Sequence, residues 1–499
     1  MSQHSLLQEQ PKESSFSIRP YLPPLIAIVI GTFMVILDST AVNVALPTWV
    51  RDFGVTLQTM QWAVTAYTLA LSAVIPLAGW LSDKFGAKRV FLSSIGFFTL
   101  GSLLCAFAQT SGQLILFRVI QGLGGGMVSP VGMAMVYRLA PPDKRGSIIG
   151  MLGIPMLLAP ALGPVISGWL VEYVSWHWIF WINLPIGLAG IWIGMKHLPS
   201  FQSQANPRLD VLGLFLGPAA FACLTFGFSE AGSGLASSYA LWGLSAGTVL
   251  LALFVISCLV QREPLLELRV MKSGPFTIGI ITSWIMQTAL FGTVLLFPLL
   301  LQQVKQLGPL ATGLHLLPQA IGSMIFMPLA GKWFDKMGAR PPLTVGMLLI
   351  SGGLFAMSIV GTDYGPSFIM LILFALGSGM GLSMMSLNTY VLNATPPQMV
   401  SRVTPLTSAS QQVVSSFAIA GFTGYLSSRI TNNAGKELSA MDAHTAAFSD
   451  TFWLAACIAT VGLVCSFLLK KKTPSAKKGS SSSVNDSNER IHEHDQFPL

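Results

Sequence analysis

Long apolar runs recur along this chain from near Tyr21 to Leu469, and they constrain its fold more than any other feature. A bilayer core requires about 20 apolar residues per helix, and most of the runs have that length. Because lipid offers no hydrogen-bond partner to a backbone, such runs must form helices. A membrane barrel would show runs of about ten alternating residues, which the sequence lacks. The runs therefore predict an all-α polytopic membrane protein.

Charge and cysteine usage exclude several other classes of protein. Charged residues make up 10% of the chain, whereas soluble domains carry about 25%. The net charge of +8 comes mostly from basic residues beside apolar runs, so it indicates membrane topology and not nucleic-acid binding. The five cysteines all fall inside apolar runs, without metal-ligand spacing. No G-x-x-x-x-G-K-[ST] loop and no nucleophile–base arrangement is visible, so we expect no metal site, no cofactor and no enzyme.

The spacing of the runs predicts fourteen membrane spans. They lie near residues 24–47, 59–81, 90–109, 112–137, 147–170, 177–196, 210–230, 238–260, 275–300, 311–333, 342–361, 366–392, 404–429 and 448–470. The basic residues test this count, because positively charged loops stay in the cytoplasm. Arg51, Lys305, Arg429 and Lys436 lie in one set of loops, Arg118 lies inside a span, and every other Lys and Arg lies in the opposite loops or the tails. We therefore expect a multi-pass protein of the cytoplasmic (inner) membrane with both termini cytoplasmic.

The two halves of the chain resemble each other. The segment Pro76-Leu77-Ala78-Gly79 recurs as Pro328-Leu329-Ala330-Gly331, and in the same register Asp83, Gly86 and Lys88 recur as Asp335, Gly338 and Arg340. Each repeat holds six spans, so the seventh and eighth spans form an insertion. Parallel six-helix repeats are typical of transporters whose substrate and coupling sites lie near the bilayer midplane between the halves.

The repeat also predicts how the chain is divided. We expect a cytoplasmic tail at residues 1–20 and a first six-helix half at 21–198. A linker with the two inserted helices follows at 199–269, and the second half occupies 270–471. A disordered cytoplasmic tail at 472–499 completes the chain, because that segment is polar and rich in Ser.

The segment from Gly79 to Lys88 resembles the G-x-L-a-D-r-x-G-r-k loop motif of the major facilitator superfamily. The resemblance extends over nearly the whole chain, and in that family this loop latches the cytoplasmic face of the outward-open state. It implies a gating role for Gly79, Asp83, Lys84, Gly86 and Lys88, and for Asp335 and Arg340 in the second copy. The alternative is that these charges only set topology.

Two further motifs resemble those of the same family. Leu114 to Gly126, with Arg118, resembles its fourth-helix motif l-x-x-x-R-x-x-q-G-x-g. Gly150, Gly163, Pro164 and Gly168 match its antiporter motif, although Ala159 and Ser167 replace two of the glycines. That motif marks exporters within the superfamily, while simple close packing of small residues is the other reading.

Leu37 to Pro47 and Trp176 to Gly187 resemble signatures of the fourteen-helix drug:proton antiporter branch. The resemblance implies a multidrug efflux protein that exports lipophilic or cationic compounds, with the proton gradient as its energy source. A dedicated exporter of one amphiphile (an antibiotic, a siderophore or a lipid) fits the same motifs. An importer and a non-transporting membrane receptor also stay open, and a separate membrane-fusion adaptor is undetermined.

Asp38 and Arg118 are the candidate proton-coupling residues. An unpaired arginine in hydrocarbon costs at least about 2.5–3.5 kcal/mol, so Arg118 needs a partner or a wet cavity. Asp38 is predicted at nearly the same depth, about 12 Å from the outer end of its helix at 1.5 Å per residue. Burial favours the neutral acid and a nearby cation favours the carboxylate, so a small movement can switch its charge. A fixed ion pair, or an aspartate that braces Asn43, is the alternative.

A pocket for lipophilic compounds should be apolar and adaptable, with few polar groups. Met and aromatic side chains suit such a pocket because they repack around varied ligands. The candidates for this cavity are Asn43, Trp62, Tyr67, Trp284, Gln287, Phe291, Met384, Met385 and Asn388. Small lipophilic substrates, protons and membrane lipid are therefore the expected partners.

Overall fold

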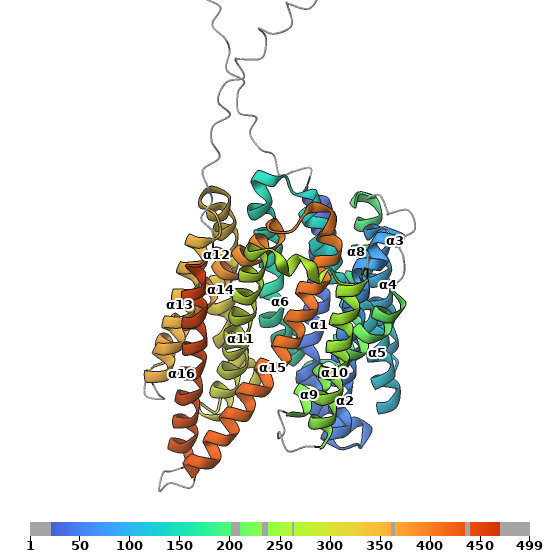
Figure 1. Ribbon diagram of the computed structural model, residues 1–499. Coiled ribbons are helices and arrows are strands. Elements are labelled where there is room, and N and C mark those ends of the chain that lie inside the picture. The colour runs from blue at the N-terminus through green and yellow to red at the C-terminus, as the bar shows by residue number, and fades with distance from the viewer. Residues whose placement is uncertain are drawn as a thin grey trace, which may run out of the picture.

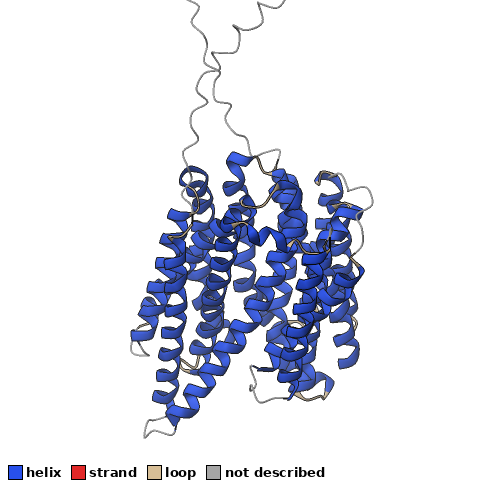
Figure 2. Ribbon diagram, in the orientation of Figure 1, coloured by secondary structure: helices blue, strands red, loops and turns tan. Residues whose placement is uncertain are grey.

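The computed structural model describes residues 21–200, 210–231, 238–261, 264–360, 365–434 and 440–469. Within these ranges the chain is helical and contains no strand (Figure 2). The prediction of an all-α membrane fold is therefore confirmed. The tails predicted at 1–20 and 472–499 lie outside the described residues.

The helices form one elongated bundle whose long members run side by side (Figure 1). The first half comprises α1 (Leu22–Phe53), α2 (Leu57–Val74) with η1 (Ile75–Leu77) and α3 (Ala78–Phe85), α4 (Ala87–Ala106), α5 (Ser111–Leu139), η2 (Pro142–Lys144), α6 (Arg145–Tyr173), α7 (Trp178–Trp181) and α8 (Asn183–His197). The inserted pair is α9 (Val211–Ala231) and α10 (Ser238–Val260). The second half comprises η3 (Leu268–Lys272), α11 (Gly274–Gln303), α12 (Pro309–Met337), α13 (Arg340–Val360), α14 (Pro366–Asn393), η4 (Pro397–Met399), α15 (Val400–Ala434) and α16 (Ala440–Ser466).

The predicted number of fourteen spans is confirmed in part. Among the described residues, twelve helices are long and apolar enough to cross a membrane. The two remaining predicted spans correspond to α6 and α15, which are long helices in the middle of the bundle (Figure 1). Helix α15 is rich in Ser, Thr and Gln, which lowers its hydropathy. Two predicted spans are not single helices: Pro76 lies in the η1 turn between α2 and α3, and α7 and α8 meet at Ile182.

The sequence repeat is visible in the backbone. Gly86 and Gly338 end α3 and α12 with φ of 85° and 83°, a conformation that favours glycine because it has no Cβ atom. The turns η2 and η4, each led by two prolines, precede α6 and α15. These turns lie at the end of the bundle where α1 begins and α16 ends, which we call the terminal end (Figure 1).

The inserted pair packs against both halves. Helix α9 contacts α2 of the first half and α15 of the second. Thr225 of α9 donates a hydrogen bond of 3.2 Å to the Ser72 hydroxyl of α2, and Phe228 of α9 lies edge-on to Phe417 of α15, with ring centroids 5.4 Å apart. The insertion therefore occupies one of the seams between the halves.

Substituting Gly377 by Ala is expected to lower the melting temperature of the purified protein. A Cβ atom there would overlap the backbone carbonyl oxygen of Gln319, so α12 and α14 would have to separate. Such overpacking costs about 1–3 kcal/mol. Gly352 is the matched control, because a Cβ atom there meets nothing within 4 Å, and Gly352→Ala gains up to about 1 kcal/mol of helix propensity. Equal melting of the two variants would contradict this interpretation of the α12–α14 contact.

Candidate functional site

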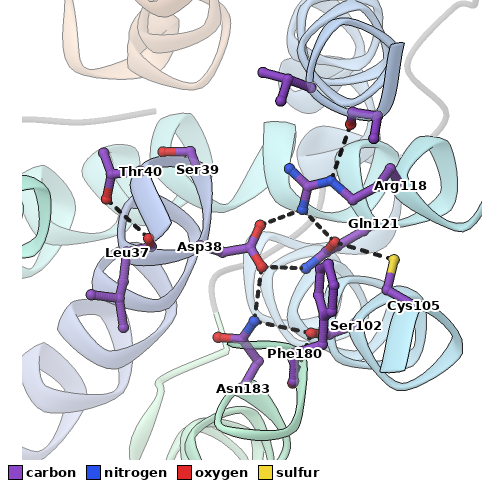
Figure 3. A network of polar contacts seen from close by, with 12 residues as sticks. Leu37, Asp38, Ser39, Thr40, Ser102, Cys105, Arg118, Gln121, Phe180 and Asn183 are labelled. Atoms are coloured by element: carbon purple, nitrogen blue, oxygen red, sulfur yellow. Dashed lines mark hydrogen bonds and ion pairs between the residues drawn. The ribbon is translucent and has the colours of Figure 1, made fainter. Parts of the chain in front are cut away.

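A buried polar network surrounds Asp38 in the middle of α1 (Figure 3). The carboxylate is 1% exposed, and three side chains from two other helices donate to it. Arg118 of α5 donates to Oδ2 at 2.5 Å, while Gln121 of α5 and Asn183 of α8 each donate to Oδ1 at 2.9 Å. A charged carboxylate in hydrocarbon is costly, and these donors supply the counter-charge and hydrogen bonds that offset the cost.

The guanidinium of Arg118 is fully buried and is satisfied within the first half. Besides Asp38, it donates to the Gln121 side-chain oxygen at 2.6 Å and to the Ala63 carbonyl oxygen at 3.3 Å. Its central carbon lies 3.9 Å from the ring centroid of Tyr67, within cation–π range. Breaking such a buried pair by removing one partner costs about 3–5 kcal/mol. The structure therefore places the two predicted coupling residues in direct contact.

Helix α4 and the break between α7 and α8 hold the far side of the network. Asn183 also donates to the Ser102 hydroxyl at 2.9 Å, and Ser102 in turn donates to the carbonyl oxygen of Phe180 at 3.0 Å. The side-chain oxygen of Asn183 is buried and has no hydrogen-bond partner among the described residues. A hollow of about 230 Å³ reaches Asp38 and Asn183 between α1, α6 and α8. A water molecule in this hollow could therefore hydrogen-bond to the Asn183 side-chain oxygen beside the Asp38 carboxylate and carry a proton to it.

Sequence reasoning missed Gln121, Asn183 and Ser102. Gln121 lies one helical turn after Arg118 in the same motif, so its side chain had to share a helix face with the arginine. Asn183 is a lone amide in an aromatic and aliphatic run. Both are polar groups within predicted spans, and a buried polar group needs partners. That requirement was the available signal for assigning them to the site.

The first copy of the loop motif holds the two halves together at the terminal end. Asp83 of α3 pairs with Arg402 of α15 at 3.1 Å, and the two side chains are 4% and 14% exposed. A Cβ atom at Gly79 would lie 2.7 Å from the Ser401 carbonyl oxygen, so only glycine allows this approach. Lys84 stays within its own half, with its amine 4.6 Å from the Trp80 ring centroid.

The second copy makes the corresponding contact with opposite halves. Asp335 of α12 accepts hydrogen bonds from the backbone N–H groups of Gly146 and Ser147 at 3.0 Å each, and from the Ser147 hydroxyl at 2.6 Å. These donors form the first turn of α6, where the helix dipole favours an anion. Gly331 meets the Gly146 carbonyl oxygen as Gly79 meets that of Ser401. Each repeat aspartate thus contacts the start of a long helix in the other half.

The remaining loop-motif residues brace their own halves. Lys88 donates to the Met195 carbonyl oxygen at 2.8 Å. The guanidinium carbon of Arg340 lies 5.3 Å from the ring centroid of Phe467, directly after the end of α16. Neither contact crosses between the halves. Among the described residues, the cross-half contacts of the loop motif are therefore those of Asp83 with Arg402 and of Asp335 with the α6 start, and we call these two contacts the latches. Tyr137 and Arg145 of the first half also donate to the Asn393 side chain of α14 at this end.

The antiporter-motif glycines of α6 face different neighbours. A Cβ atom at Gly150 would lie 2.9 Å from the Met327 carbonyl oxygen of α12, in the other half. Gly163 contacts Thr40 of α1, two residues beyond Asp38, so closely that a Cβ atom would overlap its hydroxyl. A Cβ atom built at Gly168 would meet no described atom of another helix within 4 Å, and the side chain of Pro164 lies outside the described residues. Helix α6 therefore touches both the carboxylate-bearing helix and the opposite half.

The predicted cavity residues do not gather at one place. In the first half, Trp62 stacks on Phe226 of the inserted α9, with ring centroids 6.0 Å apart, and Tyr67 lies against Arg118. The side chain of Asn43 lies outside the described residues. The Met385 side chain lies 3.5 Å from a Cβ atom built at Gly150.

In the second half, two of the three predicted residues of α11 contact α15. Trp284 donates to the Ser410 hydroxyl at 3.0 Å, and Gln287 donates to the Ser415 hydroxyl at 3.3 Å. Phe291 and Met384 are half-buried and pack against the apolar core of this half. Asn388 of α14 lines a hollow between the halves. Thr407 and Gln411 of α15 line the same hollow, and the sequence analysis did not include them among the cavity residues.

The chain is thus a multi-pass membrane protein of two repeated helical halves, with contacts between the halves at the terminal end and a buried ion pair inside the first half. A family model described as Major Facilitator Superfamily matches residues 28–419, and the chain belongs to that superfamily. The resemblance drawn from the motifs is therefore confirmed.

Several relatives are named for drug resistance. Multidrug resistance protein B homolog of Mycobacterium tuberculosis is 39% identical over 398 residues, which cover 79% of this chain and 74% of that protein. Lincomycin resistance protein LmrB of Bacillus subtilis is 31% identical over 461 residues, covering 90% and 96%. Among solved structures, the human organic anion transporter MFSD10 aligns with a TM-score of 0.63 at 13% identity, covering 90% of this chain and 99% of that one. That structural likeness shows the fold alone.

Proposed function

We propose that this protein is a proton-coupled antiporter that exports lipophilic compounds across the cytoplasmic membrane. The observation that carries the proposal is the Asp38–Arg118 pair, which is buried within the first half and bonded to Gln121, Asn183 and the Ala63 carbonyl oxygen. A carboxylate in the membrane that can exchange a proton is the simplest coupling device in such a protein. Relatives named for multidrug and lincomycin resistance support export of drugs.

Protonation of Asp38 changes the balance of the network. The neutral acid no longer attracts Arg118, whose remaining partners are the Gln121 side chain, the Ala63 carbonyl oxygen and the Tyr67 ring. The arginine then shifts toward these partners, and α1 and α5 move relative to each other. Deprotonation restores the pair. Each helix is thus biased by the charge state of one carboxyl group.

The terminal end is cytoplasmic in this proposal, because its loops carry most of the basic residues. With both latches formed there, the structure corresponds to a state closed toward the cytoplasm. A proton bound from outside would then favour the opposite, cytoplasm-open state, in which the compound is loaded.

The test is substrate-driven proton movement in everted vesicles that hold a preset pH gradient. We expect addition of an exported compound to release protons from vesicles containing the protein, and not from empty vesicles. A panel of unrelated lipophilic compounds separates multidrug export from a dedicated exporter, which would respond to one compound. No release with any compound, from protein shown to be folded, would overturn the proton-coupling proposal.

A further inference from the structure

Ser167 of α6, one of the two positions that depart from the antiporter motif, carries the further inference. The motif has glycine at this position, and here a hydroxyl group is present instead. Ser167 is fully buried, and it lines the hollow that also reaches Asp38 and Asn183, which we call the Asp38 hollow. Close packing of helices does not require a polar group at this position. The hydroxyl is therefore a polar feature of the hollow that the packing of α6 leaves unexplained.

The Asp38 hollow lies inside the first half. All of its described lining residues come from α1, α6 and the break between α7 and α8. A Cβ atom at Gly313 of α12 would lie 3.0 Å from the Val165 side chain, so Val165 faces the second half. Ser167 points nearly the opposite way, because a helix turn takes about 3.6 residues. Its side of α6 is that of Gly163, which meets Thr40 of α1. The hydroxyl therefore faces α1 and not the other half.

Three oxygen-bearing groups around this hollow can each accept a further hydrogen bond. Asp38 accepts bonds from Arg118, Gln121 and Asn183, and a carboxylate has about four lone-pair positions. The Asn183 side-chain oxygen is buried without a partner among the described residues. The Ser167 hydroxyl donates to the Gly163 carbonyl oxygen at 2.7 Å, so its own oxygen is able to accept. Buried waters typically make about three hydrogen bonds to such groups.

The inner part of the hollow has room for about one water molecule. A water there can donate to the Asn183 oxygen and to the Ser167 oxygen, while its own oxygen accepts from neutral Asp38. When Asp38 is charged, the same water turns one hydrogen toward the carboxylate. On proton loss, the Asp38 O–H bond breaks, the water gains that proton, and one of its other protons passes to the next water outward. The water is thereby restored, and either charge state of Asp38 keeps a partner.

We propose that the Asp38 hollow binds a water molecule between the Asn183 oxygen, the Ser167 hydroxyl and the Asp38 carboxyl group, and that the Asp38 proton enters and leaves through this water. Ser167 and Asn183 are positioning residues, since they hold the water and do not themselves exchange the proton with Asp38. The role of the water in transport rests on the proposed antiport function, whereas the water site does not. The proton route then runs inside the first half, separate from the contacts between the halves.

Infrared difference spectra between high and low pH test for the water. They are recorded on the full-length protein in lipid nanodiscs, without substrate or gradient. A carboxyl band that Asp38→Asn removes identifies protonation of Asp38, because the titratable groups around it, Arg118, Tyr67 and Cys105, carry no carboxyl group. We expect an O–H stretching band that accompanies this protonation and shifts when the solvent is heavy-oxygen water.

Two substitutions should remove or shift the water band: Ser167→Ala and Asn183→Ala. Ser386→Ala is the matched control. Ser386 of α14 is equally buried and donates to the Leu382 carbonyl oxygen, also at 2.7 Å, but it lies in the second half and does not line the Asp38 hollow. The control should therefore keep the band.

The route is tested by filling the hollow. Ser167→Val fills it from α6 and Ala41→Val from α1, so one variant suffices if the other fails to fold. We expect each to slow the hydrogen–deuterium exchange of the Asp38 carboxyl group at least about tenfold, followed at low pH after transfer to deuterated water. Met133→Phe tests the alternative route, because Met133 lines the hollow between the halves. This variant should not slow the exchange.

The absence of the water band from the wild type would overturn the inference, and so would its equal loss in Ser386→Ala. Slow exchange in Met133→Phe, with normal exchange in a folded valine variant, would place the route between the halves and overturn it as well. These measurements use no substrate, so they are separate from the transport assay. The expected band and exchange rates without substrate-driven proton release would reject only the antiport proposal. Proton release without a water band would reject only this inference.

Discussion

The Asp38→Asn variant is expected to lose substrate-driven proton release completely, down to the level of empty vesicles. Asparagine has nearly the same shape as the neutral acid and can still accept a hydrogen bond from Arg118, so the network stays in the arrangement that we propose for protonated Asp38. It cannot bind or release a proton, however, and the charge on α1 no longer changes. The measurement is proton release on addition of an exported compound, in vesicles with equal amounts of each protein.

Stability has to be separated from coupling in this experiment. Asp38→Asn leaves Arg118 charged and fully buried without a counter-charge, which costs about 3–5 kcal/mol. The double variant Asp38→Asn with Arg118→Gln removes that charge, so we expect it to melt closer to the wild type and still not to release protons. Asp52→Asn, at the exposed outer end of the same helix, should behave like the wild type. Retained proton release by a folded Asp38→Asn protein would reject Asp38 as the coupling residue.

The parts of the site that carry charge were predictable from the sequence. An aspartate and an arginine inside apolar runs must find each other or water, and the structure pairs Asp38 with Arg118 at 2.5 Å. The duplicated loop likewise predicted that Asp83 and Asp335 occupy equivalent places. A charged side chain in lipid is costly unless it has a partner of opposite charge or water. Few partners are possible within the apolar spans, so the sequence predicts the pairing well.

The neutral polar groups were much less predictable. Ser, Thr and Gln side chains of a membrane helix can bond to their own backbone, as Thr407 does to the Thr404 carbonyl oxygen at 2.8 Å. Their presence on α15 therefore does not say which face meets a cavity. The stacking of Trp62 on Phe226 depends on where the inserted pair docks, and the periodicity of a nearly uniform apolar helix does not encode that position.

Helix α5 links the features described above. It carries Arg118 and Gln121 in the ion-pair network, Met133 at the hollow between the halves, and Tyr137, which donates to the Asn393 side chain of α14 at 3.0 Å. The distance from Arg118 to Tyr137 along the helix is about 28 Å at 1.5 Å per residue. In the coupling proposed above, a movement of α5 that follows the charge of Asp38 would reach one wall of the hollow between the halves and one contact at the terminal end, across Pro130 inside the helix.

Removing both repeat aspartates is expected to open the terminal end. Asp83→Asn breaks the ion pair with Arg402. Asp335→Asn removes the negative charge at the start of α6 and so weakens the hydrogen bonds from the Gly146 and Ser147 N–H groups. Hydrogen bonds to charged groups contribute about 1.5–3 kcal/mol each, so the single variants should shift the equilibrium by about tenfold or more per latch. The double variant should lose most transport, because the state closed toward the terminal end is no longer populated.

A buried cysteine reports this opening directly. In a background without the five native cysteines, Ser401→Cys places a thiol where Gly79 contacts α15, at a position only 4% exposed. We expect a membrane-impermeant maleimide, supplied from the terminal side, to label it at least about tenfold faster in the double variant. Lys84→Gln is the control, since it removes a charge from the same loop whose contacts stay within its own half. If the two aspartates hold the halves together, only their removal should speed the labelling. Unchanged labelling in the double variant, or equally fast labelling after Lys84→Gln, would therefore show that they do not.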